Sequence, residues 1–197
     1  SPVIPVVERV SESPTPEPPT PTPEPEPIGR WTVTDGPEEP RGGHFAICLA
    51  DGRVLVGGGQ SADGVLSSAE IFDPADETWS ATGSMTEGRS NAVAVLLADG
   101  RVLVSGGITG AALATSEIYD PASGEWEPAP DMTAPRAAHS ATLLGDGRVL
   151  VAGGWTGRSR INSFQVGAEI FEPDSSTWSV VADMPAPRLG HTAVSRP

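Results

Sequence analysis

Two short apolar runs flank an Asp-Gly pair in the stretch HFAICLADGRVLVGGG, which extends from His44 to Gly59. An Asp-Gly pair between two apolar runs is a strong local signal for a β-hairpin. The runs are apolar almost throughout rather than alternating, as at Ala46, Ile47 and Leu49, and this is typical of strands covered on both faces. The pattern therefore predicts a hairpin in a small sheet that lies between two neighbouring sheets.

The sequence DGRVLV occurs three times shortly before a glycine pair, beginning at Asp51, Asp99 and Asp146. In each case an Arg stands ten residues before the Asp, an aromatic residue and a proline end a third apolar stretch, and a Trp follows the aromatic residue by seven positions. The recurring residues are Arg41, Arg89 and Arg136; Phe72, Tyr119 and Phe171; and Trp79, Trp126 and Trp178. A period near fifty residues indicates a radial array of small sheets. We expect each repeat to be a four-stranded antiparallel meander.

The Trp of each repeat opens the fourth predicted strand. A Trp side chain can bury roughly 150–250 Å² between sheets, and its loss costs about 3–5 kcal/mol. We therefore expect Trp79, Trp126 and Trp178 to occupy equivalent buried positions in the core. Trp31 has the same ten-residue spacing to Arg41 but no first three strands before it, so it predicts a strand that closes the ring by pairing with the last sheet.

These recurring features resemble the kelch motif: apolar residues before a double glycine, then an aromatic residue, then a Trp seven positions later. The resemblance covers residues 31–197. The sequence of the repeats is similar to that of bacterial secreted kelch proteins and of the propeller of galactose oxidase-like proteins. It implies an all-β fold of four-stranded antiparallel blades in a β-propeller. On this basis residues 29–40 form the closing strand, residues 41–88, 89–135 and 136–187 form three blades, and residues 188–197 begin a fourth.

Kelch propellers usually have six or seven blades, whereas this sequence supplies about three. Three blades alone would leave whole apolar faces open, well beyond the few hundred Å² that a monomer usually exposes. We therefore expect a fragment of a six- or seven-bladed propeller, with roughly three more blades downstream.

Residues 1–28 differ from the rest in composition, since residues 1–30 contain ten prolines interleaved with Thr, Ser and Glu. Such a segment favours extended polyproline II and predicts a disordered linker. One interpretation is a tether that holds the following domain away from a cell surface, with Thr and Ser open to O-linked sugar. The other is a disordered tail or a chance SH3-type ligand.

The composition argues against several kinds of partner and site. With 26 acidic residues against 12 arginines and no lysine, the formal net charge is -14, which disfavours nucleic acid as a partner. The single cysteine, Cys48, excludes an internal disulfide. No apolar run is long enough to span a membrane, and the first ten residues lack the pattern of a signal peptide.

Three histidines occupy one repeat position, three residues after the Arg: His44, His139 and His191, with Ala92 in the second repeat. Their convergence on the axis of a propeller would allow a metal site. Shared packing in each blade is the other interpretation, and we prefer it because Ala92 interrupts the set and no carboxylate recurs beside the histidines. We therefore expect no metal and no cofactor.

The resemblance to galactose oxidase-like proteins raises the copper site of that family, which needs tyrosines, histidines and a Cys joined to a Tyr. Here Tyr119 and Cys48 fall on different predicted strands of different blades, so no copper ligand can be assigned. The Asp of each repeat is explained by a hairpin turn with positive φ. The double glycines indicate close backbone approach rather than phosphate binding, because no helix follows them.

The segment between the glycine pair and the aromatic residue differs most among the repeats. It has 12, 11 and 16 residues in the three repeats, and in a meander it lies on the same rim as the Arg that leads into the first strand. The longest version is a predicted ligand-binding loop containing Trp155, Arg158, Arg160, Asn162, Phe164 and Gln165. Aromatic and Arg side chains dominate binding hot spots, although loops also accept extra length at small cost.

Two function classes follow. The preferred one is a non-enzymatic binding module, extracellular or in the cell envelope, that engages a protein or glycan through the loops of the propeller. The alternative is the propeller part of a secreted galactose oxidase-like or sialate-processing enzyme whose catalytic residues lie outside this sequence. The ligand and the oligomeric state are not determined by the sequence.

Overall fold

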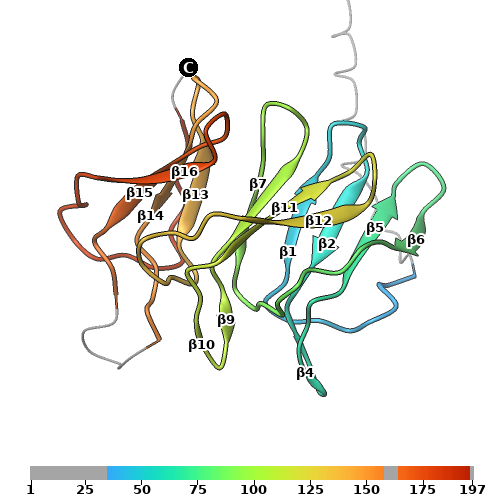
Figure 1. Cartoon of the computed structure of the whole chain (residues 1–197). Helices are drawn as coiled ribbons and strands as arrows, with labels where there is room; N and C mark the ends of the chain where they lie inside the picture. Colours follow the sequence, from blue (N-terminus) through green and yellow to red (C-terminus); the bar gives the residue numbers. More distant parts are fainter. Residues whose placement is uncertain (1–34, 158–163, 196–197) are drawn as a thin grey trace, which may run out of the picture. The chain divides into compact units, whose positions relative to one another are not determined.

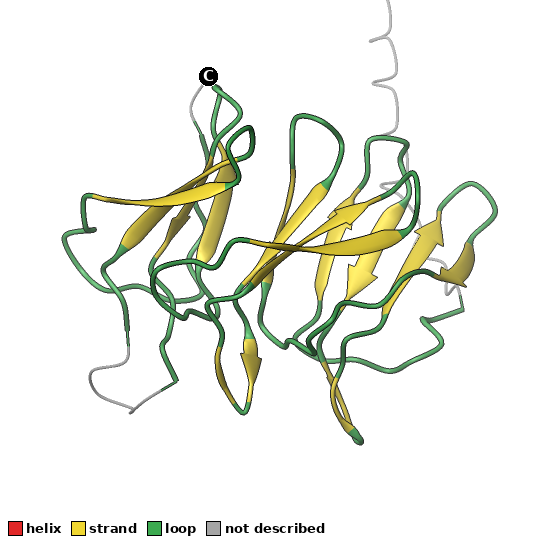
Figure 2. Cartoon of the chain, viewed as in Figure 1, coloured by secondary structure: helices red, strands yellow, loops and turns green. Residues whose placement is uncertain are grey.

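A computed structural model describes residues 35–157 and 164–195, and their regular structure is entirely β (Figure 1, Figure 2). Three four-stranded sheets follow one another along the chain. Sheet 1 contains β1 (Phe45–Cys48), β2 (Val54–Gly57), β5 (Ala69–Asp73) and β6 (Thr78–Ala81); sheet 2 contains β7 (Val93–Leu96), β8 (Val102–Ser105), β11 (Ser116–Asp120) and β12 (Glu125–Ala129); sheet 3 contains β13 (Ser140–Leu143), β14 (Val149–Ala152), β15 (Ala168–Glu172) and β16 (Thr177–Val181).

Every sheet is an antiparallel meander in which consecutive strands are neighbours, apart from two short hairpins that project from the second connection. These hairpins pair β3 (Gln60–Ser61) with β4 (Gly64–Val65), and β9 (Ile108–Thr109) with β10 (Ala111–Ala112). The predicted all-β fold of four-stranded antiparallel sheets is confirmed. Within the described residues no helix is long and apolar enough to cross a membrane. The expected linker and the Trp31 strand lie outside the described residues.

Each sheet packs its face against the next, using the same positions of the repeat. At the first interface, between sheets 1 and 2, Leu55 and Ile71 pack with Val102 and Val104. At the second interface, between sheets 2 and 3, Leu103 and Ile118 pack with Val149 and Val151 in the same way. The apolar runs are therefore nearly continuous because both faces of a middle strand are covered, as β8 shows with all four residues buried.

The three Trp side chains occupy equivalent places. Trp79, Trp126 and Trp178 each lie 5.0 Å from the aromatic ring directly opposite on the third strand. Each Nε1 donates a hydrogen bond, of 2.7–2.9 Å, to a carbonyl four residues after the Trp position of the preceding repeat; the acceptors are Asp35, Gly83 and Pro130. The rings are half-buried rather than fully buried, because they lie on the outermost strand with one edge in solvent.

The Asp-Gly turns differ from the expected geometry in one respect. Only the glycine has positive φ, with 90° at Gly52. Leu49 and Arg53 close the hairpin, and the Gly52 amide donates to the Leu49 carbonyl. The loop is therefore a type I turn followed by a left-handed glycine, one residue longer than a two-residue turn. The Asp needs no positive φ.

The double glycines permit close approach between sheets, as predicted. The amide of the second glycine donates to the carbonyl of the Arg in the next repeat, at 2.9 Å from Gly59 to Arg89 and at 2.9 Å from Gly107 to Arg136. A Cβ on the first glycine would collide with that carbonyl oxygen. Any larger residue would force adjacent sheets apart.

Candidate functional site

The connection between the second and third strands of each sheet emerges on one edge, which we call the hairpin rim. It carries β3–β4, β9–β10 and the pair formed by Trp155 and Phe164 (Figure 1). The segment that leads into each first strand lies on the same edge, since Gly42 pairs with Gln60, Ser90 with Ile108, and Ala137 with Trp155. The described ends of the long loop, Trp155 and Phe164, therefore lie on the rim where the loop was expected.

Trp155 and Phe164 form the base of the third hairpin. They occupy the positions of Ile108 and Ala112 in β9–β10. The backbone amide of Gln165 donates to the Gly154 carbonyl, as the backbone amide of Leu113 does to the Gly107 carbonyl. Phe164 is 43% exposed, whereas Trp155 is half-buried. The indole is thus partly a packing element, because its strand pairs on both sides.

The remaining predicted ligand residues divide into two groups. Gln165 is half-buried, and its amide nitrogen donates to the Pro135 carbonyl at 2.7 Å, so it holds the base of the hairpin to the lead-in segment. Arg158, Arg160 and Asn162 lie outside the described residues. The described part of the predicted site is therefore one exposed aromatic ring beside one half-buried ring.

Beneath the hairpin rim lies a buried ion pair in every sheet, and sequence reasoning missed its acidic partner. The guanidinium of Arg89 meets the Glu117 carboxylate at 2.8 Å, and Arg136 meets Glu169 at 2.7 Å. The side chains of the two arginines are at most 1% exposed and those of the two glutamates at most 2%. Arg41 and Glu70 repeat the pair at 2.7 Å. The signal was available in the Glu that recurs in AEIF, SEIY and AEIF.

Each of these pairs makes further hydrogen bonds. Arg89 Nη1 donates to the carbonyls of Gly106 and Thr115, while Glu117 Oε2 accepts from the backbone amide and hydroxyl of Thr86. The carboxylate therefore joins the lead-in segment to the third strand of the sheet. The Nε atoms of Arg89 and Arg136 are buried without a hydrogen-bond partner among the described residues, but the charges are paired and held by several further hydrogen bonds, as a buried ion pair requires. The pair therefore has a structural role at the base of the rim.

The three histidines lie in different environments. His44 is exposed, while His139 is 4% exposed with Nε2 3.0 Å from the Ser105 hydroxyl. His191 also contacts a hydroxyl, at 3.0 Å, but that of Ser140, which stands at a different repeat position from Ser105. Burial, aided by the nearby charges of Arg136 and His191, lowers the pKa of His139 to about 3. His139 is therefore a neutral packing residue between sheets 2 and 3.

At the first interface Ala92 takes the place of His139. The space is filled from the other side by Phe45, which is 6% exposed and whose ring lies where a Cβ on Gly57 would collide with it. Phe45 also makes an edge contact with Trp126, with ring centroids 6.3 Å apart. The interruption of the histidine set is therefore a packing exchange. Within residues 35–157 and 164–195, no group of three His, Cys, Asp or Glu side chains is placed to hold a metal ion.

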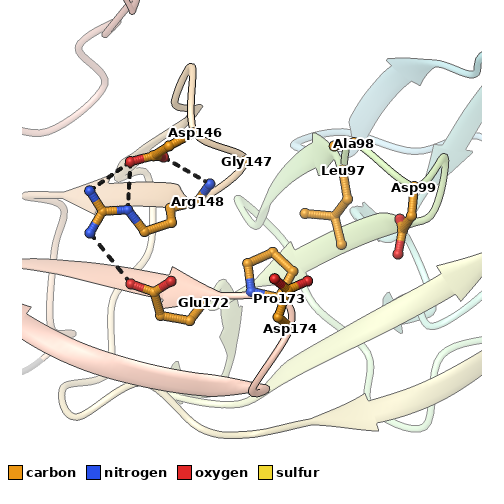
Figure 3. Close-up of a pocket in the computed structure, with 9 residues that line it drawn as sticks. All are labelled: Leu97, Ala98, Asp99, Asp146, Gly147, Arg148, Glu172, Pro173 and Asp174. Carbon is orange, nitrogen blue, oxygen red and sulfur yellow. Dashed lines mark hydrogen bonds and ion pairs between the residues drawn. The ribbon is translucent and has the colours of Figure 1, made fainter.

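The opposite edge, which we call the turn rim, carries the Asp-Gly turns and a small pocket between sheets 2 and 3 (Figure 3). Arg148 reaches Asp146 at 2.7 Å and Glu172 at 3.4 Å, and Leu97 and Asp99 face them from sheet 2. The side-chain hydrogen bond from Arg148 lowers the pKa of Asp146. The same ion pair between the Asp and the Arg of the turn recurs at Asp51 with Arg53. The pocket is therefore lined by side chains that recur in the turns of the repeats.

Tyr119 and Cys48 do not form part of a common site. The Tyr119 hydroxyl is 2.7 Å from the Thr82 hydroxyl and its ring packs on Trp126, whereas Cys48 is a free, exposed thiol on β1 of another sheet. The two side chains therefore lie on different sheets in different environments.

Comparison with known proteins gives one family and one fold. The family model of the kelch motif matches residues 41–86, 89–133 and 136–185. No curated protein sequence matches the chain. Among solved structures, that of YjhT is similar with a TM-score of 0.66 and 15% identity, covering 80% of this chain and 57% of that one. The chain thus spans little more than half the length of that relative.

Proposed function

Because the chain belongs to the kelch-repeat family, we propose that it is a non-enzymatic binding module that engages its ligand through the hairpin rim of the propeller. The ligand is a protein, with a glycan as the second class. The observation that carries the proposal is the third hairpin, which is longer than the other two and presents Phe164 43% exposed beside Trp155.

Phe164 differs from its counterparts in size and exposure. The equivalent residues of the other hairpins are Val65 and Ala112, and both are half-buried. An exposed aromatic ring is a typical anchor in a protein interface because it buries a large area at small conformational cost. The rigid base below it, held by Gln165 and by Arg136 with Glu169, keeps the ring in place.

The proposal includes a location. We place the module outside the cell or in the cell envelope, with residues 1–28 as the tether. The proline-rich composition of that segment supports an extended spacer.

The test compares the protein with the variant Phe164→Ala. Fluorescently labelled proteins are applied to a glycan array and used to capture proteins from the surface of the source cells. We expect Phe164→Ala to lose the captured ligand while its unfolding free energy changes by no more than about 0.5 kcal/mol. Val180→Ala is the matched control, since Val180 is an apolar side chain that is 64% exposed on the edge strand β16, outside the hairpins of the rim. Equal capture by the protein and by Phe164→Ala contradicts the proposal.

A further inference from the structure

Sheets 1 and 2 each place a hydroxyl beside the buried arginine, and sheet 3 does not. The Ser68 hydroxyl accepts a hydrogen bond from Arg41 Nη2 at 3.2 Å, and the Thr115 hydroxyl accepts one from Arg89 Nη2 at the same distance. The residue at this repeat position in sheet 3 is Gly167. Sheet 3 therefore has no hydroxyl of its own at this place.

The glutamate that covers the hydroxyl is also absent from sheet 3. Glu39 and Glu87 accept hydrogen bonds from the hydroxyls of sheets 1 and 2, and the two carboxylate side chains are 40% and 36% exposed. They therefore lie on the solvent side of each hydroxyl. Ala134 stands at their position before the arginine of sheet 3, so that arginine lacks both the hydroxyl and its acidic cover.

Arg136 consequently makes fewer hydrogen bonds than its counterparts. Its Nη1 donates to the carbonyls of Gly153 and Gly167, and its Nη2 donates to Glu169. Among the described residues the second N–H of Nη2 has no acceptor, whereas in sheets 1 and 2 it is bonded to the hydroxyl. A buried guanidinium donor without an acceptor favours the entry of a group that can accept a hydrogen bond.

The space over Gly167 is large enough for a small side chain and is lined by acceptors. Among the described residues, a Cβ on Gly167 would lie 3.6 Å from Gln165 Oε1, 3.9 Å from Arg136 Nη2 and 4.0 Å from Asp183 Oδ1, which are ordinary van der Waals distances. The Gln165 amide is held in this orientation because its nitrogen donates to the Pro135 carbonyl. Gly167 is half-buried and Asp183 is exposed, so the space is reached from solvent.

We propose that this space, at the base of the third hairpin, is a subsite for the hydroxyl of a serine or threonine side chain on a protein ligand; the proposal rests on the function proposed above. The ligand hydroxyl accepts from Arg136 Nη2 and donates to Asp183 or to Gln165 Oε1, in the way that the hydroxyls of sheets 1 and 2 bridge an arginine and a glutamate. Serine or threonine is favoured over a sugar because the chain itself places these two side chains at the equivalent positions. A ligand carboxylate is disfavoured, because it would face two acceptors.

The experiment follows the guanidinium signals of the whole chain, prepared with isotope-labelled arginine, by NMR. The probes are N-acetylserine methylamide, the corresponding alanine compound and methyl glucoside. We expect the serine probe to shift the Arg136 signal saturably and the alanine probe to bind at least about ten-fold more weakly, because alanine leaves the buried donor unpaired. Equal binding of the serine and alanine probes overturns the proposal. So does tighter binding of the glucoside, which would assign the space to a sugar.

The variant Gly167→Ser supplies from within the protein the hydroxyl that Ser68 supplies in sheet 1. We expect it to bind the serine probe at least about ten-fold more weakly, with no fall in melting temperature, because the new Cβ has room. Gly167→Ala, which fills the space without a hydroxyl, should weaken the probe in the same way. Gly145→Ser is the matched control, since a Cβ on Gly145 also has room and that residue lies outside the subsite. Serine binding that survives both substitutions at Gly167 overturns the proposal.

The subsite and the proposed function fail in different ways. Capture that survives Phe164→Ala, together with a serine probe that still saturates the Arg136 signal, contradicts the proposed function and supports the hydroxyl subsite. Capture that is lost in Phe164→Ala, together with equal binding of the serine and alanine probes, supports the function and overturns the subsite.

Discussion

The first and second interfaces are built on one framework but fill one position differently. Both use apolar residues at the same repeat positions, a glycine amide bonded to an Arg carbonyl, and a Trp bonded to a carbonyl of the preceding repeat. At the first interface Phe45 fills the space over Gly57 against the small Ala92. At the second, His139 fills it and bonds to Ser105.

The difference shows that the framework is fixed while the filling residues are free to exchange. A sheet-to-sheet contact needs a constant volume, and a ring from either side can supply it. The third instance supports this, since His191 faces Ser140, which stands at the repeat position of Phe45. The recurrence of a histidine at one repeat position is therefore explained by the volume that the neighbouring side chain leaves to be filled. A common metal site is not needed to explain it.

The largest expected effect comes from breaking the framework itself. Glu117→Ala and Glu169→Ala should each lower the free energy of unfolding by about 3–5 kcal/mol, because each leaves a buried guanidinium without its carboxylate. Urea denaturation followed by Trp fluorescence measures the loss. Glu127→Ala, on an exposed position of β12, is the control. A cost below 1 kcal/mol in either sheet would show that the pair is dispensable.

The second prediction converts one interface into the other. Phe45→Ser should destabilise the protein by roughly 3 kcal/mol, the lower end for loss of a buried ring. Ala92→His alone should also destabilise it, because the imidazole collides with Phe45. The double variant recreates the Ser140 and His191 arrangement, so it should be more stable than the sum of the two single variants predicts by at least about 1 kcal/mol. Strict additivity would refute the exchange of packing volume.

The third prediction concerns low pH. Of the two interfaces, only the second contains a buried histidine, His139, whose ring becomes free to bind a proton when the protein unfolds. The pKa of His139 is lowered from 6.5 to about 3 in the folded protein. The unfolded chain therefore binds the extra proton between these values, and the stability that is complete above pH 6.5 is lost as the pH falls towards 3. At pH 5 the loss is about 2 kcal/mol per histidine. The free energy of unfolding measured between pH 7.5 and 4 should fall less steeply in His139→Ala than in His44→Ala, and parallel curves would disprove the prediction.

The smallest expected effect concerns the hydrogen bond of the Trp side chain, which both interfaces contain at their outer edge. Trp126→Phe and Trp178→Phe each remove the Nε1 donor to Gly83 or Pro130 while retaining an aromatic ring. We expect each to cost about 1 kcal/mol, the net value of one hydrogen bond. Thermal unfolding by circular dichroism is the measurement. Unequal losses, with more than twofold difference, would indicate that the two interfaces do not share this contact.

Local patterns were sufficient for most of the fold. Apolar runs around Asp51-Gly52 predicted β1 and β2, and the seven-residue spacing from Phe72 to Trp79 predicted two paired strands, since these residues face each other directly. The Trp position was predicted as buried but is half-buried, because the fourth strand is an outer edge of its sheet and leaves one side of the indole in solvent. The backbone geometry of the turn Asp was also predicted wrongly, since type I and type I′ loops share the Asp-Gly signal but only the second needs positive φ at the Asp.

The sequence by itself determined the repeat, the strands, the close approach at the double glycines and the rim on which the described ends of the long loop lie. These depend on residues near each other in the chain or on the simple order of a meander. The tertiary structure alone decided that Arg136 pairs with Glu169, that Phe45 substitutes for a histidine opposite Ala92, and that Phe164 is exposed while Trp155 is half-buried. Their environments arise from contacts between segments tens of residues apart, where packing volume and desolvation select the partner. The recurring Glu marks an acidic position in the sequence but does not identify its partner.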